Sequence, residues 1–229
     1  MTLECIGQKA KEAEPILRVM TREEKDRVLL KAAELLVSEQ EKILASNEKD
    51  MEAGQERGMK KVLLDRLKLN EDRISFMAEG LRQIADLPDP VGEVMKDWVP
   101  ENSLHIRQVR VPLGVIGIIY EARPNVTADA FGLCFKTGNP VVLRGGSAAI
   151  HSNQAITEVL QQALIACGCP ESAIQLLTDT SRETAAAFMK LNRYIDVLIP
   201  RGSAGLIATV VNNSTIPVIE TGSGNCHIY

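Results

Sequence analysis

Residues 112–147 read PLGVIGIIYEARPNVTADAFGLCFKTGNPVVLRGGS. The apolar runs VIGII and VVL predict two buried strands, and the segment between them predicts a helix that ends at a Thr-Gly-Asn turn. Two buried strands joined by a helical crossover form a βαβ unit. Arg144 ends the second strand and small residues follow it, which suits a nucleotide phosphate. We therefore expect the ligand site at this edge of the sheet.

The rest of the second half continues this alternation of strands and helices. Short apolar runs predict strands at 114–120, 140–144, 174–178, 195–199 and 216–220, and helices fit at 127–137, 149–167, 181–191 and 203–212. The predicted fold class is α/β, with a Rossmann-like, mainly parallel five-stranded sheet and helices on both faces. Ligands of such a sheet bind outside the carboxyl ends of its strands.

The first 100 residues have a different composition. They hold 17 Lys and Arg and 21 Asp and Glu, whereas residues 101–229 hold nine of each, so solvated amphipathic helices precede the sheet. Thr21 and Glu24 have capping-box spacing, and Asn70 can cap a second long helix. Residues 104–111 predict a strand in a surface hairpin. We expect the helices of residues 1–100 to pack on a core of residues 104–229.

Charge and composition exclude several classes of protein. The net charge of −4 gives no support for a nucleic-acid partner, and no apolar run is long enough for a membrane span. The N-terminus has neither the basic start nor the apolar stretch of a secretory signal. Five cysteines without framework spacing predict reduced thiols and a cytoplasmic location. The three histidines are scattered, so no metal site is expected.

Two Gly-rich turns at strand ends are candidates for cofactor binding. In the first, the Arg144 guanidinium can bind a phosphate, Gly145 and Gly146 allow close approach, and Ser147 adds a hydroxyl. In the second, Arg201, Gly202, Ser203 and Gly205 open a helix whose free N–H groups can face a pyrophosphate. The alternatives are a solvent-exposed turn and a simple helix cap. No G-x-G-x-x-G follows the first strand, so the usual dinucleotide fingerprint is absent.

Two further strand ends carry candidates for the chemistry. Arg123 can hold a substrate carboxylate or phosphate, and the Asn125 amide can donate to an oxyanion, while Thr127 is expected to cap the next helix. A turn asparagine and a surface ion pair explain the first two equally well. Glu220 is a candidate general base because it precedes a Gly-rich loop. We interpret the neighbouring Cys226 as a small buried apolar residue rather than a nucleophile.

The blocks YEARPNVTADA, LRGGS and IPVIETGSGNCHIY resemble the γ-glutamyl phosphate reductase family of the aldehyde dehydrogenase superfamily, and the resemblance extends over essentially the whole chain. It implies NADPH-dependent reduction of L-glutamate 5-phosphate to L-glutamate 5-semialdehyde with release of phosphate, the second step of proline biosynthesis from glutamate. It also implies a small-molecule substrate and a homo-oligomeric full-length enzyme. A non-catalytic NADP(H)-binding module, or another aldehyde or acyl-CoA reductase of the superfamily, remains an alternative.

The resemblance also implies roles for individual residues. Arg144 takes the place of a residue that contacts the adenosine ribose, and Ser147 replaces a glutamate of many NAD-using relatives, which favours the 2′-phosphate of NADP(H). The segment from Gly202 to Gly205 matches the turn near the pyrophosphate. Glu220 matches a general base, Asn125 loosely matches an oxyanion asparagine, and Arg123 is the expected substrate anchor.

One part of the family pattern is missing from this sequence. The nucleophilic cysteine lies beyond the position of Glu220, in a second, catalytic domain that these 229 residues do not contain. The expectation is that residues 1–229 are the NADP(H)-binding domain and are inactive alone.

Overall fold

The structure is a computed structural model that describes residues 2–222. The first half contains five helices and a β-hairpin: α1 (Leu3–Arg18), α2 (Arg22–Ser38), α3 (Gln40–Glu56), α4 (Lys61–Leu67), α5 (Glu71–Asp86), β1 (Val94–Trp98) and β2 (Ile106–Val109). The second half contains β3 (Ile116–Tyr120), α6 (Asn125–Lys136), β4 (Val141–Arg144), η1 (Ser147–Ala149), α7 (Ile150–Ala166), η2 (Glu171–Ala173), β5 (Ile174–Leu176), α8 (Arg182–Phe188), β6 (Val197–Arg201) and α9 (Ala204–Asn213). No helix among the described residues is long and apolar enough to cross a membrane.

The main sheet has the strand order β5-β4-β3-β6, and all its pairs are parallel. This confirms the α/β, Rossmann-like fold class. The prediction of a fifth strand at 216–220 is wrong within the described residues, because that segment makes only one parallel bridge, between Leu198 and Val218. The Leu198 amide donates to the Pro217 carbonyl at 2.9 Å, but Pro217 has no N–H to continue the ladder.

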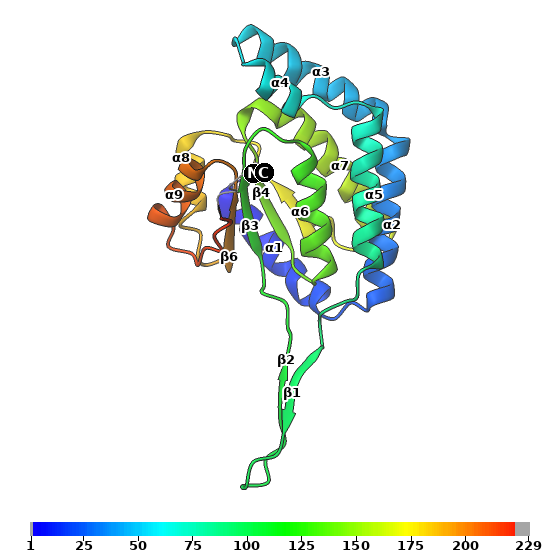
Figure 1. Ribbon diagram of the computed structural model, residues 1–229, viewed down its shortest axis with the longest axis vertical. Coiled ribbons are helices and arrows are strands. Elements are labelled where there is room, and N and C mark those ends of the chain that lie inside the picture. Colours follow the sequence, from blue (N-terminus) through cyan, green and yellow to red (C-terminus); the bar gives the residue numbers. More distant parts are fainter. Residues whose placement is uncertain (1, 223–229) are drawn as a thin grey trace, which may run out of the picture.

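Successive residues of the central strands point into two different cores. Ile116 and Ile118 of β3 belong to a large cluster with α2, α5, α6 and α7, whereas Val115 and Ile119 belong to a smaller one with α1, α8 and α9. Figure 1 shows α6 and α7 next to the sheet, with α2 and α5 outside them. Of the N-terminal helices, α2 and α5 pack in the large cluster alone, whereas α1 contributes Ile6 and Ala10 to the smaller cluster and Ala13 and Leu17 to the large one.

Two of the three expected helix caps are confirmed. The Glu24 amide donates to the Thr21 hydroxyl and the Thr21 amide donates to the Glu24 carboxylate, and Asn70 caps α5. The expectation that Thr127 is a cap is wrong, since α6 starts two residues earlier and Thr127 is buried within it. Its hydroxyl lies 2.7 Å from the Tyr120 hydroxyl and donates to the side-chain Oδ1 of Asn153 at 3.1 Å.

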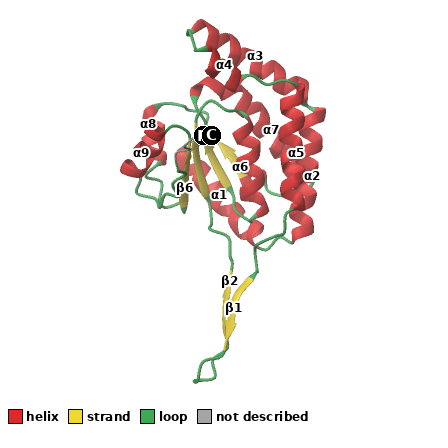
Figure 2. Cartoon of the chain, in the orientation of Figure 1, coloured by secondary structure: helices red, strands yellow, loops and turns green. Residues whose placement is uncertain are grey.

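The expected surface hairpin is present and projects from the rest of the molecule (Figure 2). Its strands pair antiparallel, with Trp98 opposite Ile106. All five residues of β1 are exposed, including the apolar Val94, Met95 and Trp98. Exposed apolar side chains on a projecting two-stranded ribbon are typical of a surface that another protein chain covers.

Candidate cofactor and substrate site

The candidate residues gather where β3, β4 and β6 end. Because the three strands are parallel, the loops that follow them lie at the same edge of the sheet. The structure brings together three segments: the loop after β3 with Arg123, which leads into α6 at Asn125, the turn of residues 144–147 at the end of β4, and the turn of residues 201–203 at the end of β6. Gly205 lies in the first turn of α9.

Arg144 is partly buried and only partly paired. Its Nη2 donates to the Thr180 carbonyl at 2.7 Å and to the Ser181 carbonyl at 3.4 Å. Burial lowers the pKa of the Arg144 guanidinium, and the nearby Asp179 carboxylate opposes that shift. The Nε atom is buried without a hydrogen-bond partner among the described residues. A buried N–H without a hydrogen-bond partner destabilises the fold, and an acceptor oxygen of a ligand would satisfy it. Arg144 therefore fits a phosphate or ribose of a dinucleotide.

The two glycines after Arg144 differ in what they require. A Cβ on Gly145 would lie 2.3 Å from the Asn153 amide nitrogen, so this position needs glycine because of internal packing. A Cβ on Gly146 would meet only backbone atoms at 3.5 Å or more, an ordinary contact. Gly146 and the exposed Ser147 therefore leave room beside Arg144, and internal packing does not restrict either position.

A carboxylate already occupies the N-terminus of α9. The Ser203 hydroxyl donates to one oxygen of Glu121 at 2.6 Å, and the Ser203 amide donates to the other at 3.2 Å. A Cβ on Gly202 would lie 2.8 Å from the Glu121 carboxyl carbon, so this glycine allows the close approach. The predicted pyrophosphate turn therefore has the donors that an anion needs, but an anion must displace Glu121 to use them.

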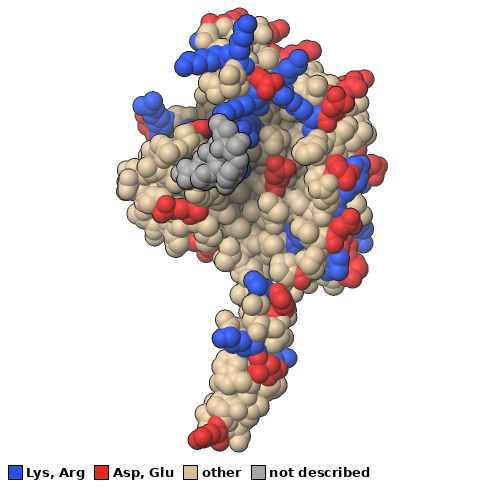
Figure 3. Space-filling model, viewed as in Figure 1, with Lys and Arg blue, Asp and Glu red and all other residues tan. Residues whose placement is uncertain are grey.

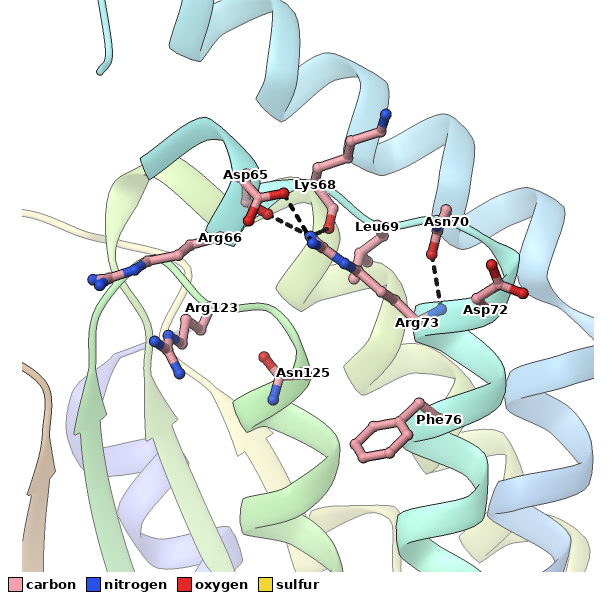
Figure 4. Close-up of a pocket in the computed structure, with 10 residues that line it drawn as sticks. All are labelled: Asp65, Arg66, Lys68, Leu69, Asn70, Asp72, Arg73, Phe76, Arg123 and Asn125. Carbon is pink, nitrogen blue, oxygen red and sulfur yellow. Dashed lines mark hydrogen bonds and ion pairs between the residues drawn. The ribbon is translucent and has the colours of Figure 1, made fainter. Parts of the chain in front are cut away.

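Arg123 and Asn125 line a cavity of about 570 Å³ between the loop after β3 and the α4–α5 connection (Figure 4). This volume lies within the usual range for small-molecule sites. The Arg123 side chain has no hydrogen bond or ion pair among residues 2–222, which leaves its guanidinium available to an anion. The cavity walls carry several charged side chains and one exposed aromatic ring, Phe76.

The amide of Asn125 is oriented by Asp129, one helical turn further along α6. The Asn125 Nδ2 donates to the Asp129 carboxylate at 3.1 Å. Burial raises the pKa of Asp129, while the Asn125 hydrogen bond and the charge of Arg201 lower it in part. An amide nitrogen has two hydrogens, so one N–H of Asn125 remains for an oxyanion.

Glu220 lies away from that cavity. It lines a separate hollow of about 370 Å³ between α9 and the segment of residues 220–222. Figure 3 shows the region around α8 and α9 as largely uncharged surface. No residue lines both hollows, so the structure does not bring Glu220 together with Asn125. Cys226 falls outside the described residues.

Sequence reasoning did not identify the residues that support the site. Glu121 directly follows β3, and it contacts Ser203 at the end of β6. Its place at the carboxyl end of a parallel strand was the sequence signal that could have identified it. Asp129 and Asn125 have the four-residue spacing of neighbours on one helix face. Asn153 contacts the first turn only through the tertiary packing of α7, which no local pattern indicates.

The described thiols and carboxylates do not form another recognisable centre. Burial raises the pKa of the Cys134 thiol to about 12, so this cysteine is a core residue and not a nucleophile. Within residues 2–222, no group of three or more His, Cys, Asp or Glu side chains is placed to hold a metal ion.

Comparison with known proteins places the chain in a family. The pattern of the aldehyde dehydrogenase family matches residues 2–228. The γ-glutamyl phosphate reductase of Moorella thermoacetica is 60% identical over 223 residues, which are 97% of this chain and 53% of the relative. That of Heliobacterium modesticaldum is 59% identical over 97% of this chain and 54% of the relative. This chain thus spans about half the length of the curated relatives it matches.

A solved structure shows the same relationship in three dimensions. The crystal structure of γ-glutamyl phosphate reductase from Thermotoga maritima superposes with a TM-score of 0.95 at 45% identity, over 98% of this chain and 54% of that chain. The yeast counterpart from Saccharomyces cerevisiae gives a TM-score of 0.87 at 28% identity, over 96% and 56%. A match to this family implies a nicotinamide cofactor. The chain belongs to the aldehyde dehydrogenase family.

Proposed function

We propose that this chain is the NADP(H)-binding part of an enzyme that reduces L-glutamate 5-phosphate to L-glutamate 5-semialdehyde and releases phosphate, the second step of proline biosynthesis, in the cytoplasm. The observation that carries the proposal is the 60% identity to a γ-glutamyl phosphate reductase over 97% of the chain. The helices of residues 1–100 and the core of residues 104–229 act as one cofactor domain, and a separate domain supplies the nucleophilic cysteine.

The residues of this chain bind and orient the reactants. Arg144 and Ser147 hold the 2′-phosphate side of NADPH, and the Ser203 amide at the start of α9 holds the pyrophosphate. NADPH, when bound, supplies the hydride that reduces the acyl group. Arg123 anchors the substrate, and the free N–H of Asn125 stabilises the oxyanion that develops at the acyl carbon.

Glu220 is the proposed general base. It lies beside α9 in a hollow of its own, exposed to solvent, and its pairing with the substrate requires the second domain to approach that hollow. The exposed β1–β2 hairpin supports a homo-oligomeric complete enzyme, because the apolar side chains of Val94, Met95 and Trp98 on β1 are exposed among residues 2–222.

The test is a titration of the purified chain with NADPH and with NADH, followed by cofactor fluorescence. We expect NADPH to bind at least about tenfold more tightly, since Ser147 gives a 2′-phosphate room beside Arg144. Arg144→Ala should remove that preference. Equal affinities for the two cofactors would contradict the NADP(H) assignment. The chain alone should form no NADPH from NADP⁺, phosphate and glutamate semialdehyde, and enzyme-dependent NADPH formation would refute the need for a second domain.

A further inference from the structure

The cavity beside Arg123 carries more positive charge than its own acids neutralise. Its lining contains four basic residues and two acidic ones: Arg66, Lys68, Arg73, Arg123, Asp65 and Asp72. Arg73 and Asp65 form an ion pair at 2.9 Å, which removes one charge of each sign. Within residues 2–222, the side chains of Arg66, Lys68 and Arg123 make no hydrogen bond or ion pair. Three cations against one remaining carboxylate make an anion the favoured occupant.

The wall that carries Arg66 is held from α5. The Arg73 guanidinium donates to the Asp65 carbonyl and, at 2.6 Å, to the Lys68 carbonyl, while its other nitrogen binds the Asp65 carboxylate. These bonds fix the chain on both sides of Arg66 (Figure 4). Arg73 therefore positions this wall and has little capacity left for a ligand.

The same wall is also held from α3. The buried Asn47 side chain donates to the Leu67 carbonyl at 2.9 Å and accepts from the Leu69 amide at 2.8 Å. Two independent sets of hydrogen bonds, one from Arg73 and one from Asn47, therefore hold the C-terminal end of this short surface helix. Rigid placement of charged side chains reduces the entropy cost of binding a ligand, so this wall is preorganised.

Arg66 and Arg123 approach the cavity from different elements. Arg66 lies on α4 and Arg123 on the loop after β3, and Figure 4 shows both guanidinium groups on the same side of the cavity. The Phe76 ring, which is 77% exposed, forms part of another wall. Two like charges on one cavity repel each other, and a ligand with an anionic group for each of them relieves that repulsion.

We propose that Arg66 is a second substrate anchor, which binds the α-carboxylate of the acyl phosphate while Arg123 binds its phosphate end. This inference rests on the proposed function. The assignment of the two ends follows from position: Arg123 adjoins the sheet edge where the cofactor binds, whereas Arg66 lies on α4, further from that edge. The reacting acyl group is next to the phosphate, so the phosphate end must lie nearer the cofactor.

The experiment measures binding of stable probes to the chain by isothermal titration calorimetry. The full probe is 2-amino-6-phosphonohexanoate, which carries both ends at the spacing of the substrate, and pentylphosphonate carries the phosphonate end alone. Arg66→Gln should weaken the full probe by about tenfold or more, because a charge-assisted pair is lost, and should change pentylphosphonate less than about twofold. Arg66→Lys should recover part of the affinity. Arg123→Gln should weaken both probes.

Lys61→Gln is the matched control, since it removes the same charge from the same helix at a residue outside the cavity lining. Circular dichroism of each variant checks that the fold is retained. The inference is overturned if Arg66→Gln behaves like Lys61→Gln, if it weakens both probes equally, or if the wild-type chain binds no full probe. The cofactor titration does not use this cavity, so NADPH binding without probe binding would refute the Arg66 anchor and leave the cofactor assignment standing.

Discussion

Replacing Glu121 by glutamine tests whether the start of α9 receives the cofactor phosphates. In the free chain the Glu121 carboxylate accepts two hydrogen bonds from Ser203. A phosphate that used the same amide must displace the carboxylate, and with the two groups then about 4–5 Å apart, two unit charges repel by roughly 1–2 kcal/mol at a solvent-exposed site. Salt screening reduces this toward about 1 kcal/mol. Glu121→Gln keeps the shape and removes the charge, so NADPH should bind about fivefold more tightly.

The same change should act on stability in the opposite direction. A carboxylate near a helix N-terminus stabilises the helix by about 0.3–1 kcal/mol, and its loss should lower the melting temperature by about 1–3 °C. Fluorescence titration and differential scanning fluorimetry measure the two effects on one sample. Glu183→Gln, at the exposed start of α8, is the control of equal charge. An unchanged or weaker NADPH affinity in Glu121→Gln, relative to that control, would refute the placement of the pyrophosphate at α9.

Three other predictions concern single positions. Gly145→Ala should destabilise the chain by about 1–3 kcal/mol in urea denaturation, because its Cβ would lie 2.3 Å from the buried Asn153 amide, and an unchanged midpoint would contradict this packing. Cys134, with its pKa raised to about 12, should escape iodoacetamide at pH 8 until the chain unfolds, and mass spectrometry of the native protein would reveal any earlier labelling. The capping hydrogen bonds with Thr21 lower the pKa of Glu24, so its stabilising effect is present above the unfolded pKa, near 4.5, and is lost as the pH falls through the folded value. The melting temperatures of wild type and Glu24→Gln should therefore differ at pH 7 and converge in acid, and a difference that persists at pH 2 would refute the assignment.

Local patterns predicted the sheet and the caps because each depends on residues that are close in sequence. Apolar runs such as VVL indicate strands whichever neighbour they pair with, and the Thr21 box is complete within four residues. The prediction of a fifth strand is wrong because Pro217 interrupts backbone hydrogen bonding within an otherwise apolar run. The prediction that Thr127 caps α6 is wrong because its hydroxyl bonds to the side chains of Tyr120 and Asn153 rather than to the backbone of its own helix.

The site was predictable only in part, for the same reason. The strand-end turns with Arg144 and Ser203 were visible because parallel strands bring their carboxyl ends together. The role of Arg66 was not predictable from the sequence, since its place in the same cavity as Arg123 depends on how α4 and α5 pack against the loop after β3. A charged residue on a short exposed helix looks like ordinary solvated surface until the tertiary structure shows what it faces.

The buried Asn47 side chain lies between the proposed cofactor site and the proposed substrate site. Asn47 bonds the backbone at Leu67 and Leu69, and it also donates to the hydroxyl of Ser152, near the start of α7, at 3.0 Å. The Ser152 hydroxyl in turn donates to the buried Asp50 carboxylate of α3 at 2.6 Å. One buried side chain thus connects the chain that follows α4, beside the Arg66 cavity, with the first turn of α7, the helix after the Arg144 turn. Thermodynamic linkage then requires any strengthening of cofactor binding by the substrate analogue to be matched, by the same factor, in the reverse titration.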